Sequence, residues 1–232
     1  MTRKGAVFAL ALVAVSLFAL PAAAAEPCAG CRLSLPEGEG PVPLLVALHG
    51  DHQPIAELHE AWKQKTVKRG IALLSLACPR ALGCNGSYWR WDGEPDWVSE
   101  QIAKVSAARA VDRDRLWLVG WSGGASYIGW RTQAFERTFA AIVIHGGGMA
   151  PASSACVEPK VPLYFLVGDK NPLHHLAGQL REHYVACGSD VTWDLVRGAE
   201  HPAEWAALSS HGKAIVDWLV AHPRGPAKAT PP

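Results

Sequence analysis

The sequence has few charged residues and no cluster of one sign. Charged residues make up 19% of the 232 positions, the formal net charge is +1, and no stretch collects Lys and Arg. A nucleic-acid partner normally needs a basic patch to meet its phosphates, so the composition argues against one. Hydrophobic residues make up 49%, enough to bury a sizeable core, which excludes a disordered chain.

A hydrophobic run long enough to span a membrane is also lacking. The longest one covers residues 6–20, after the basic pair Arg3 and Lys4 and before Pro21. A spanning helix needs about 20 apolar residues. Small residues at 23–25 offer a cleavage site. We therefore predict a signal peptide over 1–25, a secreted or periplasmic protein, and no stable membrane anchor after cleavage. An uncleaved anchor is the alternative.

Repeats, internal linkers and long insertions are absent from the sequence as well. The length fits one domain, which we place at 26–223. A flexible tail rich in Pro, Ala and Lys follows at 224–232. Because no insertion is long enough to form a lid domain, we expect an open site.

Six cysteines follow the predicted signal peptide, and an even number after an export signal predicts disulfides. Six cysteines allow 15 pairings. Sequence neighbours favour Cys28–Cys31, Cys78–Cys84 and Cys156–Cys187. A redox role for the Cys28–Cys31 pair is disfavoured, because no strand precedes it and Pro36 rules out a long helix after it.

Three histidines close in sequence, His174, His175 and His183, raise the question of a metal site. Adjacent histidines point in different directions on a helix, and no Cys or Asp ligand spacing accompanies them. We predict no metal.

Apolar runs and helical patterns alternate along the chain. Apolar runs typical of buried parallel strands cover 42–48, 71–77, 115–119, 140–144, 163–167 and 191–196. Helical spacing predicts helices over 56–68, 123–136, 176–184 and 205–219, and one that starts after Asp96 as its N-cap. The alternation predicts an α/β fold, a mostly parallel sheet with helices on both faces.

The strongest chemical signal is Gly120-Trp121-Ser122-Gly123-Gly124. A G-x-S-x-G match alone is weak, because roughly one chain of this length in ten would carry it by chance. Here a predicted strand ends at Val119 and a helix follows, which is the setting of a nucleophile elbow. Such a turn places the serine at the carboxyl end of the sheet, where α/β sheets bind ligands. We predict that Ser122 is a nucleophile; an ordinary glycine-rich turn is the alternative.

A serine hydroxyl needs a base to take its proton. His201 follows the last predicted strand, at the same sheet edge, and we predict it as that base. The acid is expected after the strand that ends at Val167, where Asp169 is the only carboxylate. We predict that Asp169 orients His201; a turn residue is the alternative.

The remaining candidates surround the nucleophile. The loop Leu48-His49-Gly50-Asp51 is expected to supply the Asp51 N–H to an oxyanion hole, and Gly123 the other N–H. The His49 side chain is expected to be structural. Trp89 and Trp91, with Tyr88, either line a substrate pocket or pack under the loop.

These motifs resemble the polyhydroxybutyrate depolymerase/feruloyl esterase group of secreted α/β hydrolases, from about residue 32 to residue 221. The residues that carry the resemblance are Leu48-His49-Gly50, Trp89-Arg90-Trp91, Asp112-Arg113-Asp114-Arg115, Gly120 to Gly124, and Gly198-Ala199-Glu200-His201. The chain departs from the group in two ways. Asn171 stands where the group has its acid, and the core is smaller, without a substrate-binding appendage.

The resemblance implies a minimal α/β-hydrolase fold, no cofactor, and cleavage of a small-molecule or polymeric carboxylic ester through an acyl-enzyme. Two alternatives remain. An acyltransferase uses the same Ser-His-acid triad, with a bound alcohol or amine in place of water. A non-catalytic binding protein that retains the fold is favoured by Asn171 at the acid position.

Overall fold

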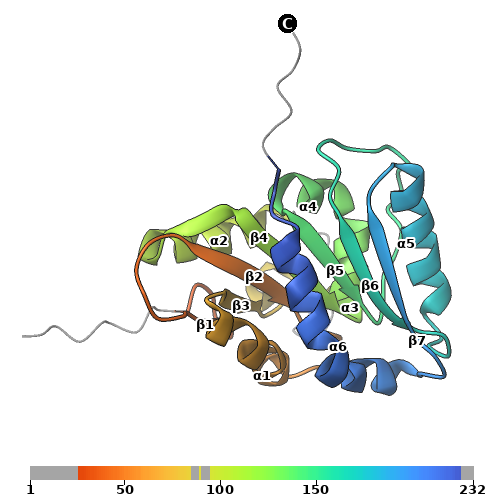
Figure 1. The fold of residues 1–232 in the computed structure, drawn as a ribbon, viewed down its shortest axis with the longest axis horizontal. Coiled ribbons are helices and arrows are strands. Elements are labelled where there is room, and N and C mark those ends of the chain that lie inside the picture. Colours follow the sequence, from red (N-terminus) through yellow and green to blue (C-terminus); the bar gives the residue numbers. More distant parts are fainter. Residues whose placement is uncertain (1–25, 85–88, 90–94, 226–232) are drawn as a thin grey trace, which may run out of the picture.

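A seven-stranded sheet forms the centre of the molecule in the computed structural model, which describes residues 26–84, 89 and 95–225 (Figure 1). The spatial order is β1-β3-β2-β4-β5-β6-β7, and all neighbouring pairs are parallel except β1 with β3. The strands are β1 (Arg32–Ser34), β2 (Val42–Leu48), β3 (Ala72–Leu76), β4 (Val111–Trp121), β5 (Ala141–His145), β6 (Leu163–Gly168) and β7 (Val191–Val196).

Six α-helices connect the strands and cover both faces of the sheet. They are α1 (Ile55–Thr66), α2 (Asp96–Ala108), α3 (Gly123–Trp130), α4 (Thr132–Thr138), α5 (His174–Ala186) and α6 (His201–Ala221). Two short 3₁₀ helices cover Val67–Arg69 and Arg80–Leu82.

Successive side chains of a strand point to opposite faces, so a strand buried on both sides feeds two cores. In β2, Leu44 and Val46 belong to the core under α2, α3, α4 and α5, whereas Leu45 and Ala47 belong to the core under α1 and α6. Figure 1 shows α1 and α6 together in front of the sheet. The predicted α/β-hydrolase architecture, a mostly parallel sheet with helices on both faces, is confirmed.

Several element boundaries differ from the sequence prediction. The expected helix over 123–136 is two helices, α3 and α4, which meet at Arg131. Asp96 is the first residue of α2 and not its N-cap, because Pro95 before it already has helical backbone angles. The short antiparallel edge strand β1 was not predicted; three residues carry too little pattern to be found.

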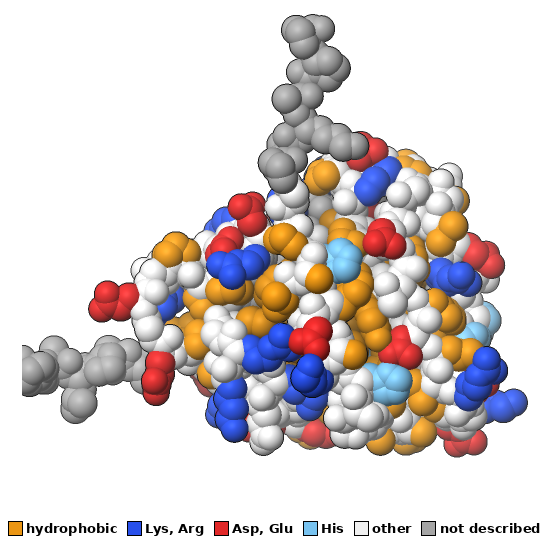
Figure 2. Space-filling model, in the orientation of Figure 1, with side chains coloured by type: hydrophobic (Ala, Val, Ile, Leu, Met, Phe, Trp, Pro, Cys, Tyr) orange, Lys and Arg blue, Asp and Glu red, His pale blue; other side chains and the backbone are white. Residues whose placement is uncertain are grey.

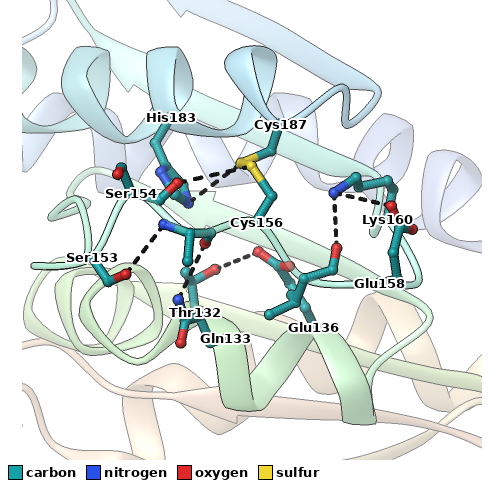
Figure 3. Close-up of a disulfide and its surroundings, with 12 residues drawn as sticks. Thr132, Gln133, Glu136, Ser153, Ser154, Cys156, Glu158, Lys160, His183 and Cys187 are labelled. Carbon is teal, nitrogen blue, oxygen red and sulfur yellow. Dashed lines mark hydrogen bonds and ion pairs between the residues drawn. A yellow bond between two sulfur atoms is a disulfide. The ribbon is translucent and has the colours of Figure 1, made fainter.

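The six cysteines form the three disulfides favoured by sequence, Cys28–Cys31, Cys78–Cys84 and Cys156–Cys187. Figure 3 shows the last of these, which ties the segment before β6 to the end of α5. A cross-link that closes a loop of about 30 residues contributes on the order of 3–4 kcal/mol in the chain-entropy model.

The ends of the chain fall largely outside the described residues. The expected signal peptide at 1–25 and residues 226–232 lie outside them. Tyr88 and Trp91 are internal residues that also lie outside the described ranges. Arg224, placed in the predicted flexible tail, is held in place: its N–H donates to Asp114 O at 2.7 Å, and its guanidinium donates to Arg137 O and Phe139 O. The helices in the described ranges include none that combines the length and the hydropathy needed to cross a membrane.

The surface over α1 and α6 mixes charges of both signs with apolar side chains (Figure 2). Surface ion pairs there, such as Arg69–Asp217 at 2.6 Å, join α6 to the segment after α1. Pairs exposed to this degree contribute at most about 1 kcal/mol each. The fold is therefore held by its two apolar cores, and its chemistry gathers at the carboxyl edge of the sheet.

Candidate active site

Ser122 lies in the sharp turn between β4 and α3, with φ 50° and ψ −112°. A non-glycine residue with positive φ costs about 1–3 kcal/mol, and such strain persists only where the surroundings enforce it. Here the Ser122 N–H donates to His145 O at 2.9 Å, which fixes the turn to the end of β5. The predicted strand–turn–helix setting of Ser122 is present.

The glycines of the motif allow the backbone to pack closely around this turn. A Cβ at Gly124 would lie 2.6 Å from Leu48 O and 2.7 Å from His49 O, and one at Gly120 would lie 2.6 Å from Ala125 N. Any side chain at either position would push the turn away from β2 or from α3. The two glycines are therefore required by packing against backbone atoms.

His201 is the first residue of α6, and its imidazole reaches the nucleophile turn. Its Nε2 lies 2.8 Å from Ser122 Oγ. Glu200 precedes the helix in an extended conformation and Pro202 occupies its first turn, an arrangement that favours a helix start at this point. The sequence-predicted pair of Ser122 and His201 is thus in hydrogen-bond contact.

The carboxylate in contact with His201 is Glu204, a residue the sequence analysis did not consider. His201 Nδ1 lies 2.9 Å from Glu204 Oε2, one helical turn away on α6. Glu204 is fully buried and also accepts hydrogen bonds from the Gly168 N–H at 2.5 Å and the Asn171 side chain at 2.6 Å. A buried carboxylate is costly unless hydrogen-bonded, and three donors meet that requirement.

Asn171 donates to this carboxylate, and the carboxylate sets the histidine tautomer. Its Oδ1 accepts from the Leu173 N–H at 2.8 Å, so its Nδ2 must face Glu204. Nδ2 also lies 3.1 Å from His201 Nδ1. Because Glu204 Oε2 is an acceptor 2.9 Å away, Nδ1 directs its own hydrogen to it. The lone pair of His201 is then on Nε2, facing the Ser122 hydroxyl.

Asp169, the predicted acid, lies elsewhere. Its Oδ1 accepts from the Gly198 N–H at 2.5 Å, a contact between two exposed turns. The hydrogen bonds between described residues do not join Asp169 to His201. β6 ends at Gly168, after which Asp169 is exposed and Asn171 is buried beside the histidine, so the structure does not bring Asp169 together with His201.

Aromatic rings pack behind the imidazole. Trp121 stacks on His201 with centroids 4.6 Å apart and planes 8° from parallel. His145 contacts Trp121 and Trp205, and its Nε2–H donates to the Glu204 backbone oxygen at 2.8 Å. Burial lowers the pKa of His145 to about 4, so this ring is neutral at physiological pH. These contacts fix both the imidazole plane and the first turn of α6.

The predicted oxyanion-hole residues lie side by side next to Ser122. Gly123 is the first residue of α3, and the first N–H groups of a helix have no acceptor within it. A Cβ at Gly123 would overlap the Asp51 carboxylate, so the Asp51 side chain packs directly on this glycine. The donor roles of the Asp51 and Gly123 N–H groups stay predictions.

His49 is buried in the same loop and holds it in place. Its Nδ1–H donates to Gly50 O at 2.8 Å, and its Nε2 accepts from the Cys78 N–H at 3.1 Å. Burial lowers the pKa of His49, in agreement with this neutral form. Trp89 donates to His49 O at 2.8 Å. The expectation of a structural role for the His49 side chain agrees with these contacts.

A pocket of about 410 Å³ opens beside Ser122. This volume falls in the range of small-molecule sites. Its polar side chains are those of Asp51, Ser122, Ser126 and Tyr127, and the remaining side chains are apolar or aromatic. The lining residues are Asp51, Trp89, Ser122, Gly123, Ser126, Tyr127, Trp130, Met149, Leu173 and Leu176. Trp89, one of the two predicted substrate-binding residues within the sequence motif, is among them; Trp91 lies outside the described residues.

One signal in the sequence could have found Glu204. Glu204 lies four residues before Leu208, eleven before Ile215 and fifteen before Leu219. These spacings place it on the same face of α6 as those apolar residues. A carboxylate on the apolar face of an amphipathic helix must be paired, because a buried charge without partners is too costly. The H-x-x-E spacing from His201 places both side chains on one face of the helix.

Comparison with known proteins supports the fold. No protein-family model and no curated protein sequence matches this chain significantly. Esterase PE8 superposes with a TM-score of 0.65 at 17% identity, covering 81% of this chain and 97% of its own. A Bacillus cereus carboxylesterase superposes with a TM-score of 0.59 at 16% identity, covering 79% of this chain and 93% of its own. An S-formylglutathione hydrolase from Staphylococcus aureus superposes with a TM-score of 0.63 at 13% identity, covering 82% of this chain and 92% of its own.

These identities are low, and they establish a shared three-dimensional fold. The chain therefore has the α/β-hydrolase fold of these enzymes over almost its whole described length. The narrower resemblance to the depolymerase/feruloyl esterase group stays a prediction.

Proposed function

We propose that this protein is a serine hydrolase that cleaves carboxylic esters through an acyl-enzyme. The observation that carries the proposal is the connected chain Ser122 Oγ–His201 Nε2 at 2.8 Å and His201 Nδ1–Glu204 Oε2 at 2.9 Å. It supplies a nucleophile, a base and an orienting carboxylate, the three roles that a serine hydrolase needs. The acid assigned here is Glu204 in place of Asp169. The fold neighbours described as an esterase and a carboxylesterase agree with this reaction class.

In the first half of the reaction, Ser122 Oγ attacks the ester carbonyl carbon while His201 Nε2 takes the hydroxyl proton. The carbonyl oxygen becomes an oxyanion next to the backbone N–H groups of Gly123 and Asp51. The imidazolium then returns the proton to the alcohol oxygen as the carbon–oxygen bond breaks. The alcohol leaves and the acyl group stays on Ser122.

The second half repeats these steps with water as the nucleophile, releasing the acid and restoring Ser122. In both halves a positive charge develops on His201. Glu204 at Nδ1 and the Trp121 ring stacked on the imidazole are placed to stabilise that charge. Acyl transfer would use the same groups with another alcohol or amine, and product analysis separates it from hydrolysis.

Glu204 also argues against the alternative that the chain is a non-catalytic binding protein. That alternative was favoured by an amide at the expected acid position. Because the buried carboxylate of Glu204 contacts His201, and Asn171 donates to that carboxylate, Asn171 does not imply a lost acid. A retained binding scaffold would have no need to bury a charge at this point.

The test is labelling with a fluorophosphonate together with hydrolysis of para-nitrophenyl esters of increasing acyl length. We expect wild type to be labelled and active, and Ser122→Ala to lose labelling and at least about a thousandfold in kcat/KM. Ser126→Ala is the matched control, because Ser126 lines the same pocket one helical turn away and has no contact with His201 among the described residues. It should still be labelled. Labelling of Ser122→Ala, or none of wild type, would refute the proposal.

We further propose that the enzyme works in a secreted or periplasmic setting. Three disulfides support this, since such bonds persist mainly in oxidising compartments. The signal-peptide pattern at 1–25 supports it independently.

A further inference from the structure

The pocket beside Ser122 runs along one face of α3. Ser122, Ser126 and Trp130 are spaced by four residues, so they follow one another on the same side of the helix and all line the pocket. With a rise of 1.5 Å per residue, Trp130 lies about 12 Å along the helix from the nucleophile. Met149, Leu173 and Leu176 form the opposite, apolar wall. A substrate that reaches Trp130 must therefore be extended and largely apolar.

A positive charge lies at this far end. The Arg131 guanidinium packs over the Trp130 ring, with Cζ 4.5 Å from the ring centroid. Its Nε is buried and has no hydrogen-bond partner. In the described parts of the chain, none of the ion pairs and none of the side-chain hydrogen bonds includes Arg131. A guanidinium has five N–H donors and always carries its charge, so the buried Nε–H of this one is free to take an acceptor from a ligand.

A second hollow is lined by both Trp130 and Arg131. Its volume is about 290 Å³, and Trp130 is the residue it shares with the Ser122 pocket. Besides Arg131, its polar side chains are those of Gln133 and Ser153. These groups, unlike the apolar middle of the Ser122 pocket, suit a charged or strongly polar end of a ligand.

The far wall of this hollow is anchored. Figure 3 shows Ser153 and Gln133 beside the Cys156–Cys187 disulfide. Gln133 Nε2 donates to Ala155 O at 3.2 Å, and the Ala155 N–H donates to Ser153 Oγ at 3.2 Å. The segment that lines the hollow is therefore tied both to α4 and, through the disulfide, to the end of α5. Arg131 itself lies at the junction of α3 and α4, so the helix that starts after Ser122 sets its distance from the nucleophile.

We propose that Arg131 binds a carboxylate at the end of the substrate remote from the scissile ester, with Trp130 packing against the adjoining apolar part. This inference rests on the proposed ester hydrolysis and names its substrate class: extended esters that end in a carboxylate. Arginine is suited to this role because its planar fork matches the two oxygens of a carboxylate. The Asp51 carboxylate lies at the opposite end of the pocket, against Gly123. It would repel a substrate carboxylate at that end, which disfavours the reversed orientation of such a substrate.

The test compares esters matched in length that differ only in the terminal group. One arm uses para-nitrophenyl monoesters of succinate, adipate, suberate and sebacate against the butyrate, hexanoate, octanoate and decanoate. The other uses acetate esters of the corresponding terminal hydroxy acids against acetates of the plain alcohols, which places the carboxylate on the alcohol side. In one of the two arms, at the longer chain lengths, we expect kcat/KM of the carboxylate-ended ester to exceed that of its methyl-ended counterpart by about tenfold or more. Equal rates in both arms would overturn the proposal.

Variants separate recognition from structural support. Arg131→Gln should abolish the carboxylate preference, because kcat/KM should fall about tenfold or more for the carboxylate-ended esters and much less for the methyl-ended ones. Arg131→Lys should restore part of the preference. Arg181→Gln is the matched control, because Arg181 packs over Trp193 in the same way, 5.1 Å from its centroid, away from the Ser122 pocket. It should leave the preference intact. Equal loss of rate for both ester types in Arg131→Gln would make Arg131 a structural residue only.

A binding measurement keeps this inference apart from the proposed function. Calorimetric titration of Ser122→Ala with the monoamide of suberate should show binding that Arg131→Gln weakens about tenfold or more, with octanamide as the neutral control. Hydrolysis of neutral esters without carboxylate preference or binding would refute this inference and leave the proposed function standing. Binding of the monoamide by a protein that fails fluorophosphonate labelling would refute the function and leave the Arg131 site standing.

Discussion

The loop after β6 and the first turn of α6 each carry a carboxylate near the carboxyl edge of the sheet. In the loop, Asp169 is exposed and accepts one hydrogen bond, from the Gly198 N–H. On α6, Glu204 is fully buried and accepts hydrogen bonds from Gly168, Asn171 and His201. The two residues have the same charge and very different surroundings.

The loop therefore contacts the surroundings of the histidine through an amide donor, and the carboxylate there comes from the helix. Asn171 occupies the position expected for the acid, but it now donates to a carboxylate supplied by the helix. The carboxylate oxygen that contacts His201 Nδ1 lies on α6, 2.9 Å away. Substitutions in the two regions should therefore have very unequal effects.

The largest effect is expected for Glu204→Gln. It replaces the buried carboxylate by an amide, which removes the negative charge and allows the wrong tautomer of His201. We expect kcat to fall about ten-thousandfold, as when a triad acid is neutralised. The measurement is steady-state hydrolysis of an aryl ester, with folding checked by circular dichroism. Near-normal turnover in folded protein would remove Glu204 from the triad.

A smaller loss is expected for Asn171→Ala, which removes one donor to Glu204 and leaves the carboxylate in place. We expect kcat to fall about ten- to a hundredfold, in keeping with an outer partner that orients a reacting group. Asn171→Asp should not rescue activity, because it brings a second carboxylate within hydrogen-bond distance of Glu204. An increase in turnover for Asn171→Asp would instead identify the natural protein as a weakened enzyme.

The pH dependence of stability tests the role of His145, which contacts the first turn of α6. The pKa of His145 is about 4 in the fold, against about 6.5 when unfolded, because the ring is buried. The unfolded chain thus binds more protons between those values, and stability is present above about pH 6.5 and lost as pH falls toward 4. We expect His145 to account for about 2 kcal/mol of the loss between pH 7 and pH 5.

The measurement is urea unfolding at both pH values for wild type and His145→Gln. The variant should lose less stability on acidification than wild type. Other buried histidines, His49 and His59, have pKa values lowered by burial and add a loss of the same sign to both proteins. An identical pH dependence in the two proteins would contradict the assignment to His145.

The smallest effect is expected for Asp169→Asn, which keeps the shape of the exposed turn and its hydrogen-bond acceptor. We expect kcat to stay within about threefold of wild type, and the free energy of unfolding to change by less than about 0.5 kcal/mol, as for most surface substitutions. Kinetics and urea unfolding measured beside Glu204→Gln complete the comparison. A collapse of kcat in Asp169→Asn would restore the sequence-based assignment.

Features that depend on neighbouring residues could be predicted from the sequence. Apolar runs gave six of the strands within a few residues, since burial on both faces requires them to be continuously apolar. The motif around Ser122 gave the turn, because its glycines answer local steric demands. His201 followed from its place after β7, and the cysteine pairs from their spacing.

The identity of the residue beside His201 was decided by the tertiary structure. The sequence places Asp169 after β6 and Glu204 on α6, but it does not say which side chain turns inward. That choice depends on contacts between segments more than thirty residues apart, from Gly168 and Asn171 to Glu204. A carboxylate is buried only where several donors converge on it, and such convergence exists only once β6 and α6 have packed together.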